Sequence, residues 1–251
     1  MKHSQQKKNN TKYKDKGKYK DEFGANMTKY KIIYSKRKTI SLKIKENGDL
    51  EVRAPNGTSK NQIAKFVESK EKWVNKHIHR IKENYIARKD FNLKFGDEIY
   101  LRGKGIAISP VSGKIAKYKD EAFLIPKNCN KEEIREIAIK LYKKIAKKHI
   151  KERISYFKEK MNVEPTGIRI TSAKTRWGSC SGKNTINFSW KLIMADDEVI
   201  DYVIVHELAH IKEHNHSPNF WLLVESIIPD YVERKKKLKK LGEKLNKENW
   251  D

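Results

Sequence analysis

Two histidines and a glutamate stand at a spacing that can bind and use a metal ion. His206, Glu207 and His210 form the pattern H-E-x-x-H. On a helix, residues four apart lie on one face about one turn apart, so both imidazoles can bind the same ion. Glu207 follows the first ligand, where its carboxylate can take a proton from water that the ion activates. The pattern indicates metal-dependent hydrolysis.

The alternative is a buried helix whose two histidines have only a structural role. Residues 199–211 are apolar on nearly every side, which predicts a helix inside its domain. Burying His and Glu there costs free energy unless a partner satisfies them. Because a metal ion would be such a partner, we favour the metal site.

A third ligand must come from beyond this helix. His214 continues the row of His206 and His210. On a straight helix it would lie about 6 Å beyond His210, and three imidazoles in a line cannot surround one ion. The chain has to turn first, and Asn215 tolerates the left-handed conformation that such a stop requires. We therefore predict His216 as the third ligand of one Zn²⁺ per chain, although three imidazoles also accept other divalent ions.

Residues 176–181, with the sequence R-W-G-S-C-S, have two interpretations. Arg176 and Ser179 could bind an anionic substrate group or the developing oxyanion. Alternatively, the segment is a tight turn in which glycine and Ser179 satisfy backbone groups and Trp177 packs in the core. A nucleophilic role for Cys180 is disfavoured because nothing in the sequence marks a thiolate of low pKa.

Four stretches carry a resemblance to a known family. They are residues 175–181 (TRWGSCS), 186–190 (INFSW), 203–210 (VIVHELAH) and 214–221 (HNHSPNFW). Residues 29 to about 240 resemble the YgjP-type metallopeptidase-like domain, which is related to the SprT and Spartan zinc proteases. The resemblance implies a zinc site built by the H-E-x-x-H histidines and His216, with Glu207 as the catalytic acid/base. It also implies a helix-rich, zincin-like metalloprotease core that follows an N-terminal β unit.

The chain is expected to have an α+β fold with three parts. Residues 1–28 are Lys-rich and nearly free of aliphatic side chains, which predicts a disordered tail and departs from the family pattern. Residues 29–128 alternate with period two in several short runs, which predicts a β-rich subdomain. One helix within it is expected from Ser59 to Ile78. Residues 129–251 are expected to form a helical, zincin-like metal-binding domain.

Within this last part the sequence indicates which elements position the histidines. A long helix should begin at residue 130 or 131, with an apolar stripe that is interrupted at His149. Two strands should then flank a turn at Gly178 and Gly182. Asp196 or Asp197 should cap the helix that carries H-E-x-x-H. Further helices are expected from Ser217-Pro218, a capping residue followed by a first-turn proline, and over residues 231–247.

The chain is strongly basic, with 57 Lys and Arg against 32 Asp and Glu and a net charge of +25. Such a charge suggests a nucleic-acid partner. We favour a solvated lysine surface instead, since few of the basic residues are Arg, the usual reader of bases and phosphates. Two distant cysteines fit a reducing compartment, and neither a signal peptide nor a membrane span is evident. We therefore expect a cytoplasmic protein.

Three functions remain open on the sequence. The first is a zinc metallopeptidase that acts on protein or peptide, with Glu207 as general base. The second uses the same metal to hydrolyse a phosphoanhydride such as a nucleoside triphosphate. The third is a nucleic-acid-binding module with a structural metal, which fits less well because three ligands and an adjacent carboxylate leave the open position of a catalytic zinc.

Overall fold

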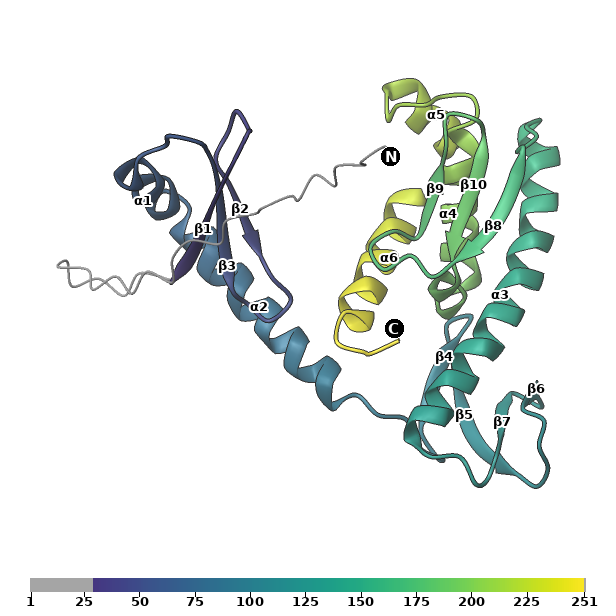
Figure 1. Cartoon of the computed structure of the whole chain (residues 1–251). Helices are drawn as coiled ribbons and strands as arrows, with labels where there is room; N and C mark the ends of the chain where they lie inside the picture. Colours follow the sequence, from purple (N-terminus) through teal and green to yellow (C-terminus); the bar gives the residue numbers. More distant parts are fainter. Residues whose placement is uncertain (1–28, 251) are drawn as a thin grey trace, which may run out of the picture. The chain divides into compact units, whose positions relative to one another are not determined.

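A computed structural model describes residues 29–250, which contain three small sheets and six α-helices (Figure 1). Sheets and helices both contribute extensively, which confirms the predicted α+β class. The tail predicted over residues 1–28 lies outside the described residues. None of the described helices is both long enough and apolar enough to cross a membrane.

The described chain divides into two compact units, and the division differs from the predicted boundary at residue 128. The first unit covers residues 29–45 and 49–75, and the second covers 46–48 and 76–250. The strands between residues 98 and 126 belong with the C-terminal helices because they share one hydrophobic core. Phe123, for example, packs 5.0 Å from the ring of Tyr142.

The first unit is a three-stranded sheet with a short helix. Its elements are β1 (Tyr30–Ser35), β2 (Ser41–Ile44), β3 (Leu50–Pro55), α1 (Lys60–Glu68) and the first turn of α2 (Glu71–Asp90). β3 is central, parallel to β1 and antiparallel to β2. Ser59 caps α1 as predicted, but the helix breaks after Glu68 instead of continuing to Ile78. The hydroxyl of Ser69 donates to the Phe66 carbonyl at 2.7 Å, an alternative to the helical pattern that helps to end α1.

The second unit begins with a four-stranded sheet packed on a long helix. The strands are β4 (Glu98–Leu101), β5 (Lys104–Val111), β6 (Lys117–Lys119) and β7 (Ala122–Pro126), in the order β4-β5-β7-β6. α3 (Lys131–Met161) starts at an Asn130 capping box and is one continuous helix, as predicted. Its buried residues recur every three or four positions: Ile134, Ala138, Tyr142, Ala146, Ile150, Ile154, Phe157 and Met161.

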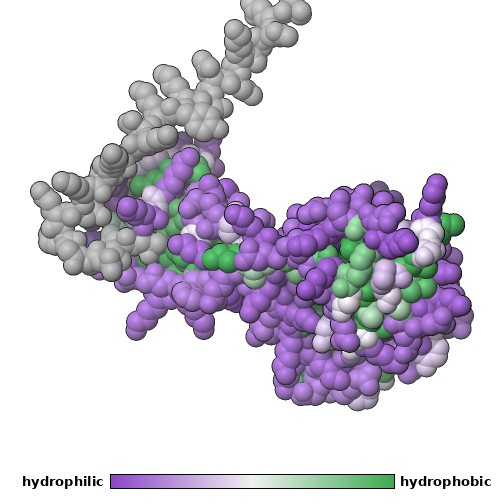
Figure 2. Space-filling model, turned by 90° about the horizontal axis from the view of Figure 1, so that it is seen from below, coloured by the Kyte–Doolittle hydropathy of each residue, from purple (hydrophilic) through white to green (hydrophobic). Residues whose placement is uncertain are grey.

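The last part of the second unit carries the histidines. Its elements are β8 (Gly167–Thr171), β9 (Gly178–Cys180), β10 (Thr185–Ser189), the 3₁₀ helix η1 (Trp190–Met194), α4 (Asp197–Ala209), α5 (Pro218–Ile227) and α6 (Tyr231–Leu245). The sheet order β8-β10-β9 makes β9 an edge strand beside α4 (Figure 1). Gly178 therefore begins a strand, where the sequence predicted a turn. Figure 2 shows hydrophilic residues over most of the visible face of this unit.

Candidate metal centre

α4 holds two of the predicted ligands in place. It is buried along most of its length, from Val199 to Ala209, so it is fixed by the core. His206 lies in its last turn and His210 is its C-cap residue, with ring centroids 5.1 Å apart. One helical turn therefore brings the two imidazoles to a common point.

The third histidine returns to these two from the start of α5. Ser217 caps α5 by accepting from the Phe220 amide at 3.3 Å, with Pro218 in the first turn. His216 precedes this cap, and its Nε2 lies 3.1 Å from Nε2 of His206. One ligand atom from each of the three histidines lies within 4.8 Å of the others.

The turn between the helices differs from the expected one. Among the described residues, Asn215 is not one of those with a left-handed backbone. The helix instead ends earlier, at His210, whose own backbone stays in the right-handed region. His214 lines the same pocket but is not part of the three-histidine cluster. The cluster therefore contains His216 and not His214, and the role of His216 as third ligand stays a prediction.

Burial favours the neutral form of two of the three imidazoles, those of His206 and His210. Burial lowers the pKa of His206 to about 3, and the neighbouring His210 and His216 act in the same direction. Burial also lowers the pKa of His210. Nδ1 of His210 lies 3.1 Å from the Glu213 carbonyl oxygen, so Nδ1 can carry the ring proton. Nε2 then keeps a free lone pair that can bind a metal ion. Neutral ring nitrogens that converge in this way fit a divalent cation.

An aromatic ring supports all three histidines from within the core. Phe220 is fully buried, and its ring centroid lies 4.9 Å from that of His206, 4.6 Å from His210 and 4.8 Å from His216. It stands four residues after His216 on α5. Phe220 was not singled out from the sequence, where its position four residues after His216 was the available signal.

Glu207 lies beneath the edge strand β9. Its side chain is only 6 % exposed, and burial raises the pKa of its carboxyl to about 7, although a hydrogen bond from the Cys180 amide opposes the shift. A Cβ on Gly178 would come within 2.6 Å of both Cγ and Oε1 of Glu207. The absence of a side chain at position 178 therefore makes room for the carboxylate, a role that the sequence did not reveal.

A pocket of about 490 Å³ opens between β9 with its following turn and the histidine segment. It is lined by Gly178, Ser179, Cys180, Ser181, Gly182, His206, Glu207, His210, His214 and His216. The carboxylate and the three imidazoles thus face one solvent-accessible space. The arrangement can hold an ion, admit water to it and accept a proton from that water.

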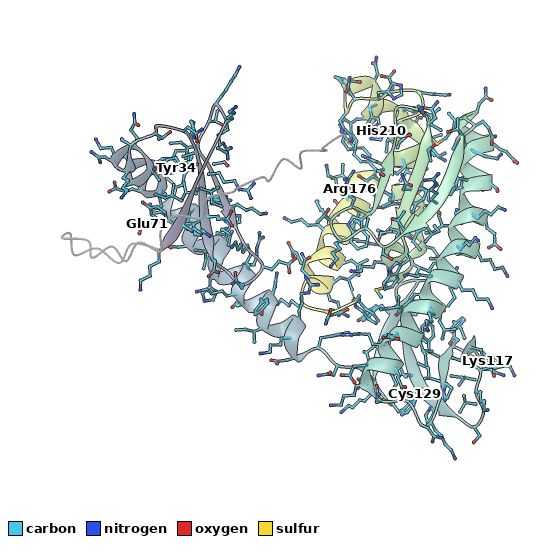
Figure 3. All side chains as sticks on the ribbon, in the orientation of Figure 1. Tyr34, Glu71, Lys117, Cys129, Arg176 and His210 are labelled. Carbon is cyan, nitrogen blue, oxygen red and sulfur yellow. The ribbon has the colours of Figure 1, made fainter. Side chains whose placement is uncertain are left out.

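The two predicted substrate-binding residues have different positions. Ser179 lines the pocket and accepts a hydrogen bond of 3.3 Å from the Asn187 amide group. Arg176 is exposed on the connection between β8 and β9 and is not among the lining residues (Figure 3). Burial and the nearby Glu207 raise the pKa of the Cys180 thiol, which agrees with its expected lack of nucleophilic character.

Comparison with known families gives the class of this protein. The chain belongs to the YgjP-like family: a model described as the YgjP-like metallopeptidase domain matches residues 38–241. The family match makes the protein a metal-dependent hydrolase of the peptidase type.

Two solved structures show a partial likeness. The metallopeptidase zymogen abylysin of Pyrococcus abyssi is 25 % identical, with 36 % of this chain and 92 % of that chain covered and a TM-score of 0.35. The metallopeptidase zymogen jannalysin of Methanocaldococcus jannaschii is 26 % identical, with 36 % and 94 % covered and a TM-score of 0.34. A search of curated proteins found no match.

Proposed function

We propose that the protein is a zinc-dependent peptidase in which Glu207 is the general base. His206, His210 and His216 would hold one zinc ion per chain. One observation carries the proposal: three ring nitrogens converge within 4.8 Å beside a buried carboxylate, in a pocket open to solvent. Three protein ligands leave a coordination position for water or substrate, as catalytic zinc sites do.

The chemistry of Glu207 follows from its surroundings. When bound, the metal supplies a Lewis acid that lowers the pKa of water and polarises a carbonyl group. A carboxyl group with a pKa of about 7 can accept a proton from the attacking water near neutral pH. It can then donate that proton to the leaving amine nitrogen. The Ser179 hydroxyl, in the same pocket, is a candidate donor to the substrate carbonyl oxygen.

The edge of β9 supports an extended peptide as the substrate. The backbone amide of Ser189 donates to the Trp177 carbonyl, and that of Ser181 donates to the Thr185 carbonyl. Because hydrogen-bonded positions alternate along an antiparallel pair, the backbone N–H and C=O of Ser179 also point toward β10. The backbone groups of Gly178 and Cys180 then point to the free edge, where the Cys180 amide binds Glu207. A peptide can add to the remaining groups as a further strand, directly beside the carboxylate.

The other two functions gain no support from the pocket. Among its described lining residues there is no Lys or Arg, which a phosphoanhydride would need to balance its charge. Binding of an anionic substrate group or the oxyanion by Arg176 stays a prediction, and Arg176 is not among the residues that line the pocket. Nucleic-acid binding by the basic surface also stays a prediction, and affinity for DNA that falls steeply with salt would support it.

Glu207→Gln tests the proposed base. The substitution keeps the shape of the side chain, so zinc should stay bound while the cleavage rate falls by roughly a hundredfold or more. Glu225→Gln is a matched control, because Glu225 is exposed on α5 and does not line the pocket. Rates on an unfolded protein such as casein, with zinc content measured on the same samples, give the answer. Unchanged activity in Glu207→Gln would remove Glu207 from the mechanism.

A further inference from the structure

One ammonium group near the metal centre lies over an indole ring instead of pairing with a carboxylate. Nζ of Lys235, in α6, is 4.9 Å from the ring centroid of Trp221. Four other basic residues of α6 form ion pairs: Arg234 with Asp230, Lys236 with Glu233, Lys237 with Glu198 and Lys239 with Glu243. Lys235 is exposed, and no carboxylate within the described chain pairs with it.

Trp221 connects this ammonium to the metal centre. Its ring stacks on His216, with centroids 5.6 Å apart and planes at 24°. Tyr231 stacks on the same indole at 5.2 Å and 19°. The rings of His216, Trp221 and Tyr231 therefore form a continuous aromatic wall, and Lys235 lies against it. Ring separations of this size place the ammonium within about three residues of extended chain from the metal ligands.

The contact with the indole leaves the charge of Lys235 available. A cation over an exposed aromatic face is held only weakly, whereas an ammonium and a carboxylate form a stronger, charge-assisted hydrogen bond. A substrate carboxylate that reaches this wall could therefore pair with Lys235 without first breaking an ion pair of the protein. A single free ammonium suits one carboxylate better than a polyanion, whose phosphates need several cations.

We propose that Lys235 is a specificity-determining residue that binds a carboxylate of the peptide substrate close to the scissile bond. This inference rests on the proposed peptidase function. The carboxylate can belong to an Asp or Glu side chain or to the C-terminus of the peptide. Both have the same chemistry, and the two sources are separated by the experiment.

The experiment begins with the cleavage sites of the metal-loaded protein in casein, located by mass spectrometry. Peptides spanning one site then carry Glu or Gln at each position up to three residues from the cleaved bond. Further pairs of peptides end at each of these positions on the C-terminal side of the bond, one member of each pair as the free acid and the other as the amide. If Lys235 binds an acidic side chain, Glu is preferred over Gln at one position. If it binds the C-terminal carboxylate, the free acid is preferred over the amide.

Lys235→Gln and Lys235→Glu test the residue, and Lys240→Glu is the matched control. Lys240 is exposed on the same helix without a described ring or carboxylate contact, so its reversal changes the net charge equally. We expect the wild type to prefer the carboxylate by about threefold to tenfold in kcat/KM, mainly through KM. Lys235→Gln should lose this preference, Lys235→Glu should reverse it, and Lys240→Glu should keep it.

Binding gives a second readout that does not depend on turnover. Dissociation constants of the same peptides for the Glu207→Gln protein should show the same preference, and the further change Lys235→Gln should abolish it. Equal binding of acidic and neutral peptides, or equal effects of Lys235→Glu and Lys240→Glu, would overturn the role of Lys235 while leaving the peptidase proposal intact. Failure of the wild type to cleave any peptide would instead remove the peptidase proposal.

Discussion

At the scale of single residues, the clustering of three histidines was predictable because their spacing has a direct physical meaning. Two histidines one turn apart on a helix must share a face. His216 was expected because the chain had to turn before a third imidazole could return, although the helix ends at His210, before the expected stop at Asn215. The structure brings all three together, although their role as ligands stays a proposal. What spacing could not reveal was the surroundings: Phe220 beneath the three rings, and Gly178 against Glu207. These contacts join segments that are distant in sequence.

Gly178→Ala should impair catalysis with little loss of metal. A Cβ at 2.6 Å from Cγ of Glu207 forces the carboxylate or β9 to move. Since displacements near 1 Å can cost large factors in rate, we expect kcat to fall by roughly tenfold to a hundredfold. Gly182→Ala is the control, because Gly182 lines the same pocket and a Cβ there meets nothing within 4 Å. Equal activities of the two variants would contradict this account of Gly178.

At the scale of elements, helices with caps were predicted better than strands. Asn130, Ser59 and Ser217 cap the helices that their positions indicated. β9 was missed because it has only three residues, two of them glycine or serine, and is defined by its pairing with β10. The apolar stripe of α3 was expected to be interrupted at His149, but the buried row continues from Ala146 through Ile150 to Ile154.

A cluster of charged groups joins α3 to α4 and to the β4–β5 turn. His149 lies 3.2 Å from Asp197, which also pairs with Arg102, and Arg153 binds Asp201 through two hydrogen bonds of 2.6 and 2.7 Å. Burial lowers the pKa of His149 below its usual 6.5, and the nearby Arg102 adds to the shift. The hydrogen bond from Arg102 lowers the pKa of Asp197 below 3.8.

These shifts predict two separate losses of stability on acidification. The fold favours neutral His149, so its contribution is complete above pH 6.5 and decreases as the pH falls toward the folded-state pKa. The contribution of ionised Asp197 is present above pH 3.8 and is lost only at lower pH. His149→Gln should therefore make the decrease in the free energy of unfolding just below pH 6.5 less steep, and the part that remains comes from His206 and His210, whose pKa values burial also lowers. Urea titrations across this range measure it, and an unchanged slope would exclude His149 as the cause.

At the scale of the whole molecule, fold class was predictable and the division of the chain was not. Alternating and helical periodicities indicated an α+β protein, which the structure confirms. The boundary expected at residue 128 was placed by a change from strand-like to helical pattern. Packing overrides that change: Tyr142 of α3 donates a 2.6 Å hydrogen bond to the Tyr100 carbonyl of β4 and stacks 5.5 Å from Trp190. Such contacts leave no periodic signal.

A fragment of residues 76–251 should fold and keep the metal centre. The core of the second unit is formed by buried residues between Leu93 and Trp250, and every residue of the pocket lies in this range. We expect one cooperative unfolding transition and the same metal content as the full chain. A fragment starting at residue 129 is the comparison: without β4–β7 it exposes part of this core and should be unstable or insoluble. Stable folding of the shorter fragment would contradict the shared core.

Metal analysis of the purified protein tests whether the three histidines hold an ion. One zinc ion per chain is expected in the wild type, and His216→Ala should lose it under the same purification. His214→Ala should keep the metal, because His214 lines the pocket without joining the three-histidine cluster. Wild-type protein that binds no divalent metal, or full metal content in His216→Ala, would contradict the proposed centre and the peptidase mechanism built on it.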